Sequence, residues 1–187
     1  MRSTGTCATG DPIRDRRYGG AVRLASRTGA VVDLSPRGYQ FGPAPEPSDW
    51  DANWLVIRGL VVLPDGRSWS FTDPCLTTWE AREIGSWLAS VIAGDVKPFV
   101  FEGGEDERLL MFTEPVVAFG LASRGDGVVT IRVHFSLEAQ PPWARDCRDE
   151  DDDVDFFADF VEIELGIDAV VQAATAWDEE LAEFPVR

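Results

Sequence analysis

The polar side chains with the best spacing for chemistry lie on one predicted strand, residues 128–138. Arg132, His134, Ser136 and Glu138 recur at every second position, so all four are predicted to share one polar, solvated face of the sheet. A histidine near a serine and a carboxylate can act as a general base beside a nucleophile, or line a small ligand cleft. No Gly-x-Ser-x-Gly elbow surrounds Ser136, and a single histidine is more typical of a solvated or hydrogen-bonded residue. This face is therefore an alternative site, and no catalytic residue is predicted.

A second candidate is a run of carboxylates near the end of the chain. Its members are Asp149, Glu150, Asp151, Asp152, Asp153 and Asp155. The run lacks the Asp-x-Asp-x-Asp-Gly spacing of an EF-hand loop, so neither a metal site nor a cofactor is predicted. Such runs are usually solvated loops, and the alternative is that this one binds a cationic partner. Trp143, which follows two prolines, either anchors such an interface or clamps the end of the sheet.

The net charge restricts the class of partner. The chain of 187 residues holds 33 acidic and 17 basic side chains, a formal charge of −16, and residues 141–187 hold 15 acidic residues against 3 arginines. Such a field repels phosphates and anionic membrane surfaces, so we expect no direct binding of nucleic acid or membrane. The surface suits a basic protein, although acidity can also serve solubility alone.

The N-terminal region and the cysteines add little chemistry. Residues 1–20 are rich in Gly, Thr and Arg without apolar periodicity, which predicts a disordered leader before a single domain over residues 21–187. This leader lacks the apolar core of a secretion signal, and no apolar run is long enough for a membrane helix, so a cytoplasmic protein is expected. Cys7, Cys75 and Cys147 are scattered and odd in number, which predicts free thiols.

The elements that must position these residues begin with residues 49–76, around which the chain is organised. A nearly continuous apolar strand, 54–63, precedes a Pro-Asp-Gly turn and a short return strand over 68–71, which predicts a hairpin. Gly59 interrupts the apolar strand and indicates a bulge or a close approach. Another hairpin is predicted over residues 21–34.

Two amphipathic helices are predicted to pack on the sheet. The first begins at a capping box formed by Thr77 and Glu80 and ends before Gly94. The second is expected to begin at Asp168 as its N-cap. Its predicted buried residues are Val171, Ala174, Trp177, Leu181 and Phe184.

The remaining apolar segments are predicted to be strands. They cover residues 99–101, 109–112, 116–122, 128–138 and 156–165. Successive strands joined by short turns, with two helices on one face, predict an α+β class, namely a single antiparallel β-sheet-rich domain with two amphipathic helices packed on the sheet.

Several short segments of the sequence resemble the WapI-type immunity proteins of bacterial toxin systems. They are Asn53-Trp54-Leu55-Val56, the run from Trp69 to Leu76 with Asp73-Pro74 inside it, Glu114-Pro115, Phe135-Ser136-Leu137-Glu138, Pro141-Pro142-Trp143, and the ending from Trp177 to Pro185. The resemblance covers roughly residues 22–187 and leaves the leader outside. It implies an antiparallel-sheet domain with helices, in which Asn53, Trp54, Asp73, Pro74, Glu114, Pro115 and Trp177 serve the fold.

The resemblance also implies a function. Proteins of this family neutralise a toxin that neighbouring cells deliver, and the name-giving toxin carries a tRNA-cleaving nuclease domain. The chain is accordingly expected to be a non-enzymatic immunity protein that occludes a basic effector domain. The carboxylates of residues 149–155 and Trp143 are the expected binding residues, because they can replace phosphates on a basic surface. The alternative is a ligand-binding or hydrolytic domain that uses the polar face around His134.

Overall fold

The computed structural model describes residues 22–42, 50–104, 106–145 and 156–187. The predicted leader and the acidic run at 149–155 therefore lie outside the described residues. The α+β class is confirmed, but the strands form two antiparallel sheets where one was predicted. The first sheet has the order β1 (Val22–Ala25), β2 (Val31–Tyr39), β3 (Trp54–Val62) and β4 (Ser68–Thr77). The second has the order β5 (Val117–Gly125), β6 (Val128–Phe135) and β7 (Phe160–Gly166).

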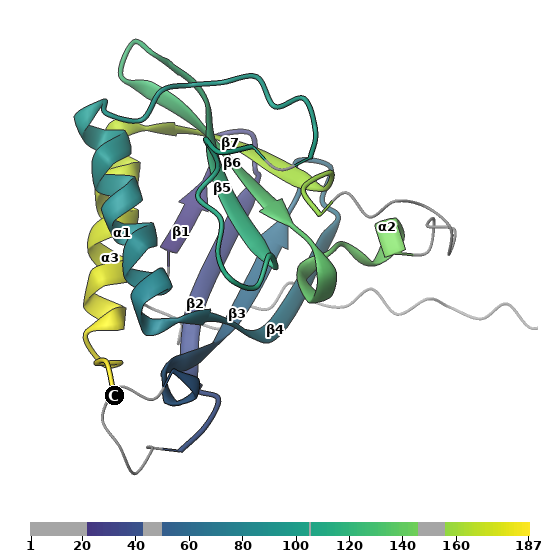
Figure 1. Cartoon of the computed structure of the whole chain (residues 1–187). Coiled ribbons are helices and arrows are strands. Elements are labelled where there is room, and N and C mark those ends of the chain that lie inside the picture. Colours follow the sequence, from purple (N-terminus) through teal and green to yellow (C-terminus); the bar gives the residue numbers. More distant parts are fainter. Residues whose placement is uncertain (1–21, 43–49, 105, 146–155) are drawn as a thin grey trace, which may run out of the picture.

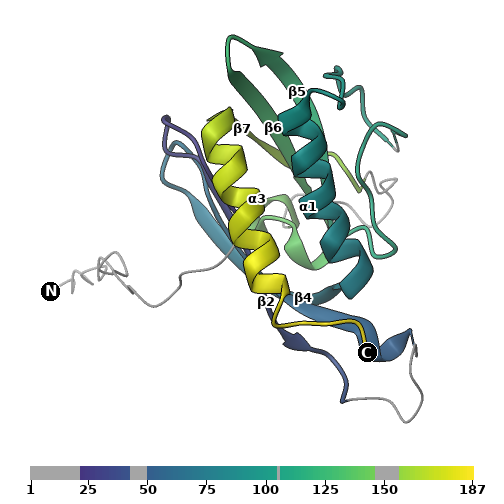
Figure 2. The same cartoon turned by 90° about the vertical axis from the view of Figure 1, so that its left-hand side faces the viewer.

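Two long helices form a layer along one side of both sheets. α1 (Thr78–Ala93) and α3 (Ile167–Leu181) run side by side, and Figure 2 views this layer with the sheets behind it. The short elements are η1 (Asp51–Asn53), η2 (Leu137–Ala139) and α2 (Pro142–Arg145), and Figure 1 shows α2 on the side of the molecule opposite the helix layer.

The main core lies between the two sheets and the helix layer. Trp69 and Phe71 of β4 meet Phe135 of β6 edge to face, with ring centroids 5.4 and 6.2 Å apart. Gly59 of β3 lies directly beneath the Phe71 ring, because a Cβ atom there would stand 2.0 Å from the ring. The predicted close approach at Gly59 is thus confirmed, and the bulge of this strand pair lies instead between Leu55 and Ile57.

Local turn and cap signals led to correct predictions. Both hairpins form, and in the second the Leu63 amide donates to the Arg67 carbonyl at 2.8 Å. The capping box is present, since the Thr77 amide donates to Glu80 Oε2 at 2.8 Å and the Glu80 amide donates to Thr77 Oγ1 at 3.3 Å. Gly94 ends α1 in the left-handed conformation, with φ of 87°.

The second helix differs from its prediction in two details. Its N-cap is Gly166, and Asp168 lies within the first turn. Val170 is buried while Val171 is 42% exposed, because Val170 is two helical turns from Trp177 and shares its inward face. The remaining predicted inward positions, Ala174, Trp177, Leu181 and the half-buried Phe184, pack in the core.

Four predicted strands are wrong in part or whole. Residues 99–101 form no strand, and residues 109–112 contribute only an isolated bridge between Leu110 and Phe119. Both belong to the long connection between α1 and β5, which crosses the outer face of the second sheet (Figure 1). β6 ends at Phe135 because Leu137 has φ of 49° and begins η2, and β7 begins only at Phe160.

Candidate functional site

The polar face of β6 is buried, so the prediction of an open, solvated face is wrong. Arg132 and His134 are 7% and 1% exposed, respectively. Four phenylalanines from two segments lie against them, and we call these residues, Phe99, Phe101, Phe157 and Phe160, the phenylalanine cover. Alternation along a strand assigns side chains to faces, but these distant segments decide which face meets water.

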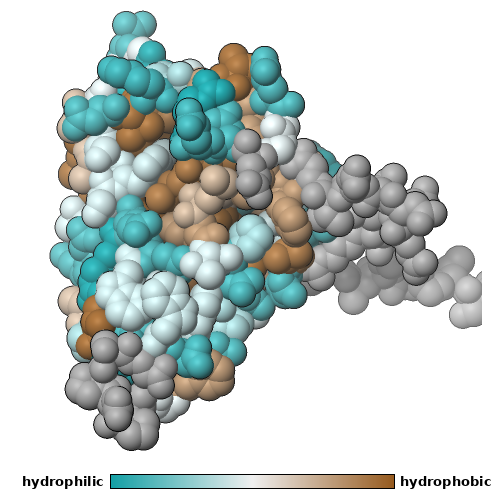
Figure 3. Space-filling model, in the orientation of Figure 1, coloured by the Kyte–Doolittle hydropathy of each residue, from teal (hydrophilic) through white to brown (hydrophobic). Residues whose placement is uncertain are grey.

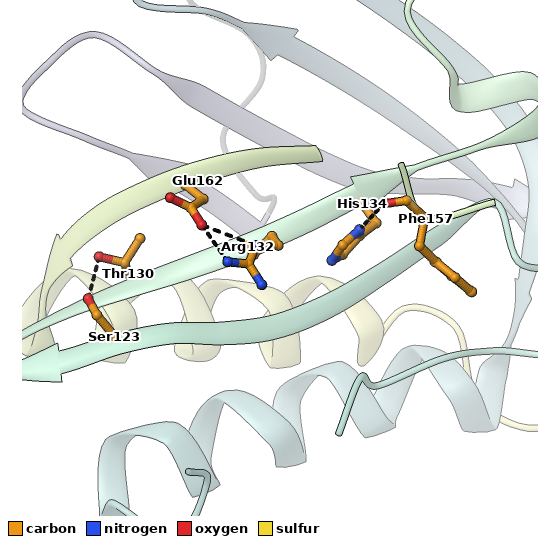
Figure 4. A network of polar contacts seen from close by, with 6 residues as sticks. All are labelled: Ser123, Thr130, Arg132, His134, Phe157 and Glu162. Carbon is orange, nitrogen blue, oxygen red and sulfur yellow. Dashed lines mark hydrogen bonds and ion pairs between the residues drawn. The ribbon is translucent and has the colours of Figure 1, made fainter. Parts of the chain in front are cut away.

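Arg132 is held by an ion pair with Glu162, which Figure 4 shows, and by contacts with aromatic rings. Its Nε and one terminal nitrogen donate to the same oxygen of Glu162 on β7, at 3.1 and 2.6 Å. Its guanidinium carbon lies 4.9 Å from the ring centroid of Phe160 and 5.7 Å from that of Phe101. A cation among aromatic faces with a carboxylate partner is a stable arrangement, and among the described residues its other terminal nitrogen is buried without a hydrogen-bond partner.

His134 and Ser136 are also engaged in structural contacts. His134 Nδ1 lies 2.7 Å from the Phe157 carbonyl oxygen, so that nitrogen carries the proton and donates (Figure 4). The ring packs 4.7 Å from Phe101, centroid to centroid. The Ser136 hydroxyl donates to the Pro115 carbonyl. Neither side chain is placed as a base or nucleophile facing solvent.

Glu138 separates from the other three polar residues. It lies in η2, beyond the end of β6, and it is exposed. The four predicted residues therefore do not share one surface. Glu138 instead joins two carboxylates from other elements.

These carboxylates form a surface that we call the acidic edge: Asp73, Glu114 and Glu138. Partial burial raises the pKa of Asp73, and the negative charges of Glu138 and Glu114 raise it further. Asp73 therefore feels the negative charge of both glutamates, which favours its protonated form. In the described part of the chain, no group of three or more His, Cys, Asp or Glu side chains is suited to hold a metal ion.

The acidic edge is positioned by a buried glutamate. Glu80 caps α1 through Thr77, and its second oxygen accepts from the Thr113 amide at 2.7 Å, which fixes the chain just before Glu114. Neither this third bond nor the acidic edge was predicted from the sequence. The sequence contained one indication of the acidic edge, because each of its three carboxylates lies in a different segment of the family resemblance.

Other segments of the resemblance contain residues that make buried contacts within the fold. Asn53 is fully buried, and its side chain bonds to the Thr78 hydroxyl and to both backbone groups of Arg187, at 2.9 to 3.0 Å. Trp54 begins β3 half-buried. Trp177 is fully buried and donates from its indole nitrogen to the Ala81 carbonyl at 2.6 Å, which joins α3 to α1.

Trp143 lies in α2 and is half-buried. Its ring meets Trp69 edge to face at 5.4 Å, and the Arg67 guanidinium lies 4.7 Å from its centroid. These contacts favour the clamp interpretation over an exposed anchor. Ten residues after α2, from 146 to 155, include the predicted acidic run and lie outside the described ranges.

Two further predictions concern reactivity and membranes. Cys75 is a free, fully buried thiol, and burial raises its pKa, so it stays protonated and inert. Among the described residues, no helix has the length and apolar character needed to cross a membrane.

Fold and site together define a small α+β domain with an acidic surface and a polar strand face closed by phenylalanines. The chain belongs to the WapI-like immunity protein family, whose model matches residues 23–185. Membership supports an immunity function and implies a toxin protein as the partner. No curated protein matches the chain significantly.

Proposed function

We propose that the protein binds a cognate secreted toxin of the polymorphic or contact-dependent kind and neutralises it by covering its effector domain. The toxin is a basic nuclease, and the protein acts in the cytoplasm during competition between bacteria. It does so by forming a stoichiometric complex, without chemistry of its own. Family membership together with the acidic edge supports this proposal most directly.

The negative charge of the protein complements the surface expected of a nuclease. An active site that holds phosphates must present basic groups, and an inhibitor covers it best with carboxylates at the same positions. The formal charge of −16 steers such a basic domain toward the protein over long range. The acidic edge then supplies three carboxylates whose mutual repulsion is relieved by a lysine or arginine of the toxin.

The binding residues that we propose follow from their positions. The acidic edge contributes Asp73, Glu114 and Glu138. The run at residues 149–155 contributes six further carboxylates, and it follows α2 with its Trp143 along the chain. Buried Arg132, His134 and Ser136 have no part in binding.

A charge-neutralising variant tests the proposal. Asp151, Asp152 and Asp153 are replaced together by Asn. Association with the cognate toxin domain is then measured at several salt concentrations. We expect k_on to fall by about tenfold at low salt and its salt dependence to weaken, because steering depends on these charges.

The control removes the same charge elsewhere. Asp168, Glu179 and Glu183 are exposed on α3 and just after its end. Their amide triple variant should associate with the toxin at a rate close to that of the wild type. Equal slowing in both triples would mean that only net charge matters. Failure of the wild-type protein to bind the domain or to protect cells that express it would refute the proposed function.

A further inference from the structure

Apolar side chains are exposed on the outer surface of the phenylalanine cover. Figure 3 shows hydrophobic residues gathered at the centre of this face, with hydrophilic residues around them. Val100 is 76% exposed and Phe160 is 42% exposed, the two most prominent members. Phe101, Met111 and Phe156 are half-buried and pack on the small cluster beneath. We call these five residues the outer patch.

The outer patch is larger than burial of β6 requires. Phe99 and Phe157 are already buried in the small cluster that includes Ala118 of β5. Val100, between two cover residues, turns outward and contributes nothing to that cluster. Contiguous exposed apolar groups rimmed by charge are typical of surfaces that bind another protein, and phenylalanine and methionine are enriched at the centres of such interfaces.

The patch is firmly supported from below. Arg132 lies beneath it, held by Glu162 and by the rings of Phe101 and Phe160. At the edge of the same cluster, the Arg108 guanidinium lies 4.4 Å from the Phe99 centroid and pairs with Asp106 at 2.6 Å. A surface whose side chains are already ordered loses little conformational entropy when it binds a partner.

The rim of the patch is acidic. Each nearby arginine is paired with one carboxylate, Arg132 with Glu162 and Arg108 with Asp106. Glu102, next to Phe101, and Glu107 are exposed, and both lie close enough to Arg108 for their charges to raise its pKa. They give the rim a surplus of negative charge, which complements lysine or arginine on a partner.

We propose that the outer patch is the apolar centre of the surface that binds the toxin. It receives an apolar side chain of the basic effector domain, while Glu102 and Glu107 pair with flanking lysine or arginine residues. This inference rests on the proposed function and adds the part of the surface that supplies most of the binding energy. Phe156 follows the acidic run directly in sequence, which makes the patch continuous along the chain with the carboxylates proposed above.

The test compares two exposed valines. Val100→Lys alters the most exposed side chain of the patch, and Val171→Lys makes the same change on α3, where the valine is 42% exposed. Their affinities for a catalytically inactive form of the cognate toxin domain are measured alongside that of the wild-type protein. We expect Val100→Lys to weaken binding by at least about 30-fold and Val171→Lys to stay within about twofold, because losses concentrate at an interface centre. Thermal unfolding of both variants should match the wild type, since both side chains are exposed.

A second pair of variants isolates the rim. Glu102→Gln with Glu107→Gln should slow association by about threefold to tenfold, whereas Glu179→Gln with Glu183→Gln on the helix side should not. Wild-type binding with no loss in Val100→Lys would overturn the patch and leave the proposed function standing. No binding by the wild-type protein would overturn both. A wild-type dimer that Val100→Lys converts to a monomer, with unchanged toxin affinity, would assign the patch to a second copy and also overturn the inference.

Discussion

Charged residues lie on the outer faces of both sheets, but the two faces differ in how deeply these side chains are buried. On the four-stranded sheet, Arg23 and Leu60 are exposed, and Asp33 lies with Arg58 beside a cavity of about 70 Å³. On the three-stranded sheet, Arg132 is buried beneath phenylalanines from two distant segments. Whether an arginine on an outer strand face is buried in structural contacts or exposed to solvent therefore depends on whether a loop crosses that face.

The largest expected effect is a difference in the free energy of unfolding between alanine variants of two arginines, one on each outer face. Arg132→Ala should lower the free energy of unfolding by about 3 kcal/mol, because the buried stem, the contacts with Phe160 and the pair with Glu162 are lost together. Arg23→Ala, on the open face, should cost less than about 0.5 kcal/mol. Urea unfolding of both variants measures the difference, and equal losses would remove the distinction between covered and open faces.

The His134→Ala variant tests whether the covered face of β6 contributes to stability alone or also to function. Loss of the bond to the Phe157 carbonyl and of packing against Phe101 should reduce the free energy of unfolding by about 2 kcal/mol. Protection of cells that express the toxin domain should be unchanged at a temperature where the variant remains folded. Lost protection by a folded His134→Ala variant would instead favour a chemical role for this face.

The smallest effect concerns Glu180 on α3, at the side of the molecule that the phenylalanine cover does not reach. Burial raises the pKa of Glu180 to about 7, Arg37 opposes the shift, and the charges of Asp33 and Glu183 add to it. The folded protein therefore holds this proton more strongly than the unfolded chain, where the carboxyl has its ordinary pKa near 4.5. Stability from this group is present at low pH and is lost as pH rises from about 4.5 through about 7.

Glu180→Gln should remove that loss. Because the side chain is partly exposed, the gain at pH 8 should stay below about 1 kcal/mol. Thermal unfolding at pH 5 and pH 8 measures it, and the decrease in Tm between the two should be smaller in the variant. A decrease of the same size in both proteins would assign the pH dependence to other groups.

The sequence predicted local features better than long-range ones. The capping box of Thr77 and Glu80 spans four residues, so its chemistry is visible in the chain, and it formed as expected. The third bond of Glu80, to Thr113, joins segments that only the fold brings together. Alternation placed Val129, Ile131 and Val133 in the core correctly, because that pattern depends only on the strand.

The candidate site depended on contacts that no local pattern contains. The apolar run around Phe99 and Phe101 predicted a strand, yet it crosses β6 as a loop and buries His134. Short apolar runs fit a strand and a covering loop equally well when their partner is unknown. Asp73, Glu114 and Glu138 lie in separate segments of the family resemblance, and only the fold brings them together at one edge.

One measurement tests the central claim, which is that the protein neutralises its toxin by binding through an acidic surface. The cognate toxin domain is titrated with the wild-type protein by calorimetry at about 50 and about 200 mM salt. The proposed nuclease activity is followed in the same mixtures. We predict a 1:1 complex that abolishes nuclease activity at equivalence and binds more weakly at the higher salt concentration. Neutralisation at substoichiometric amounts of the protein, or an affinity independent of salt, would contradict the claim.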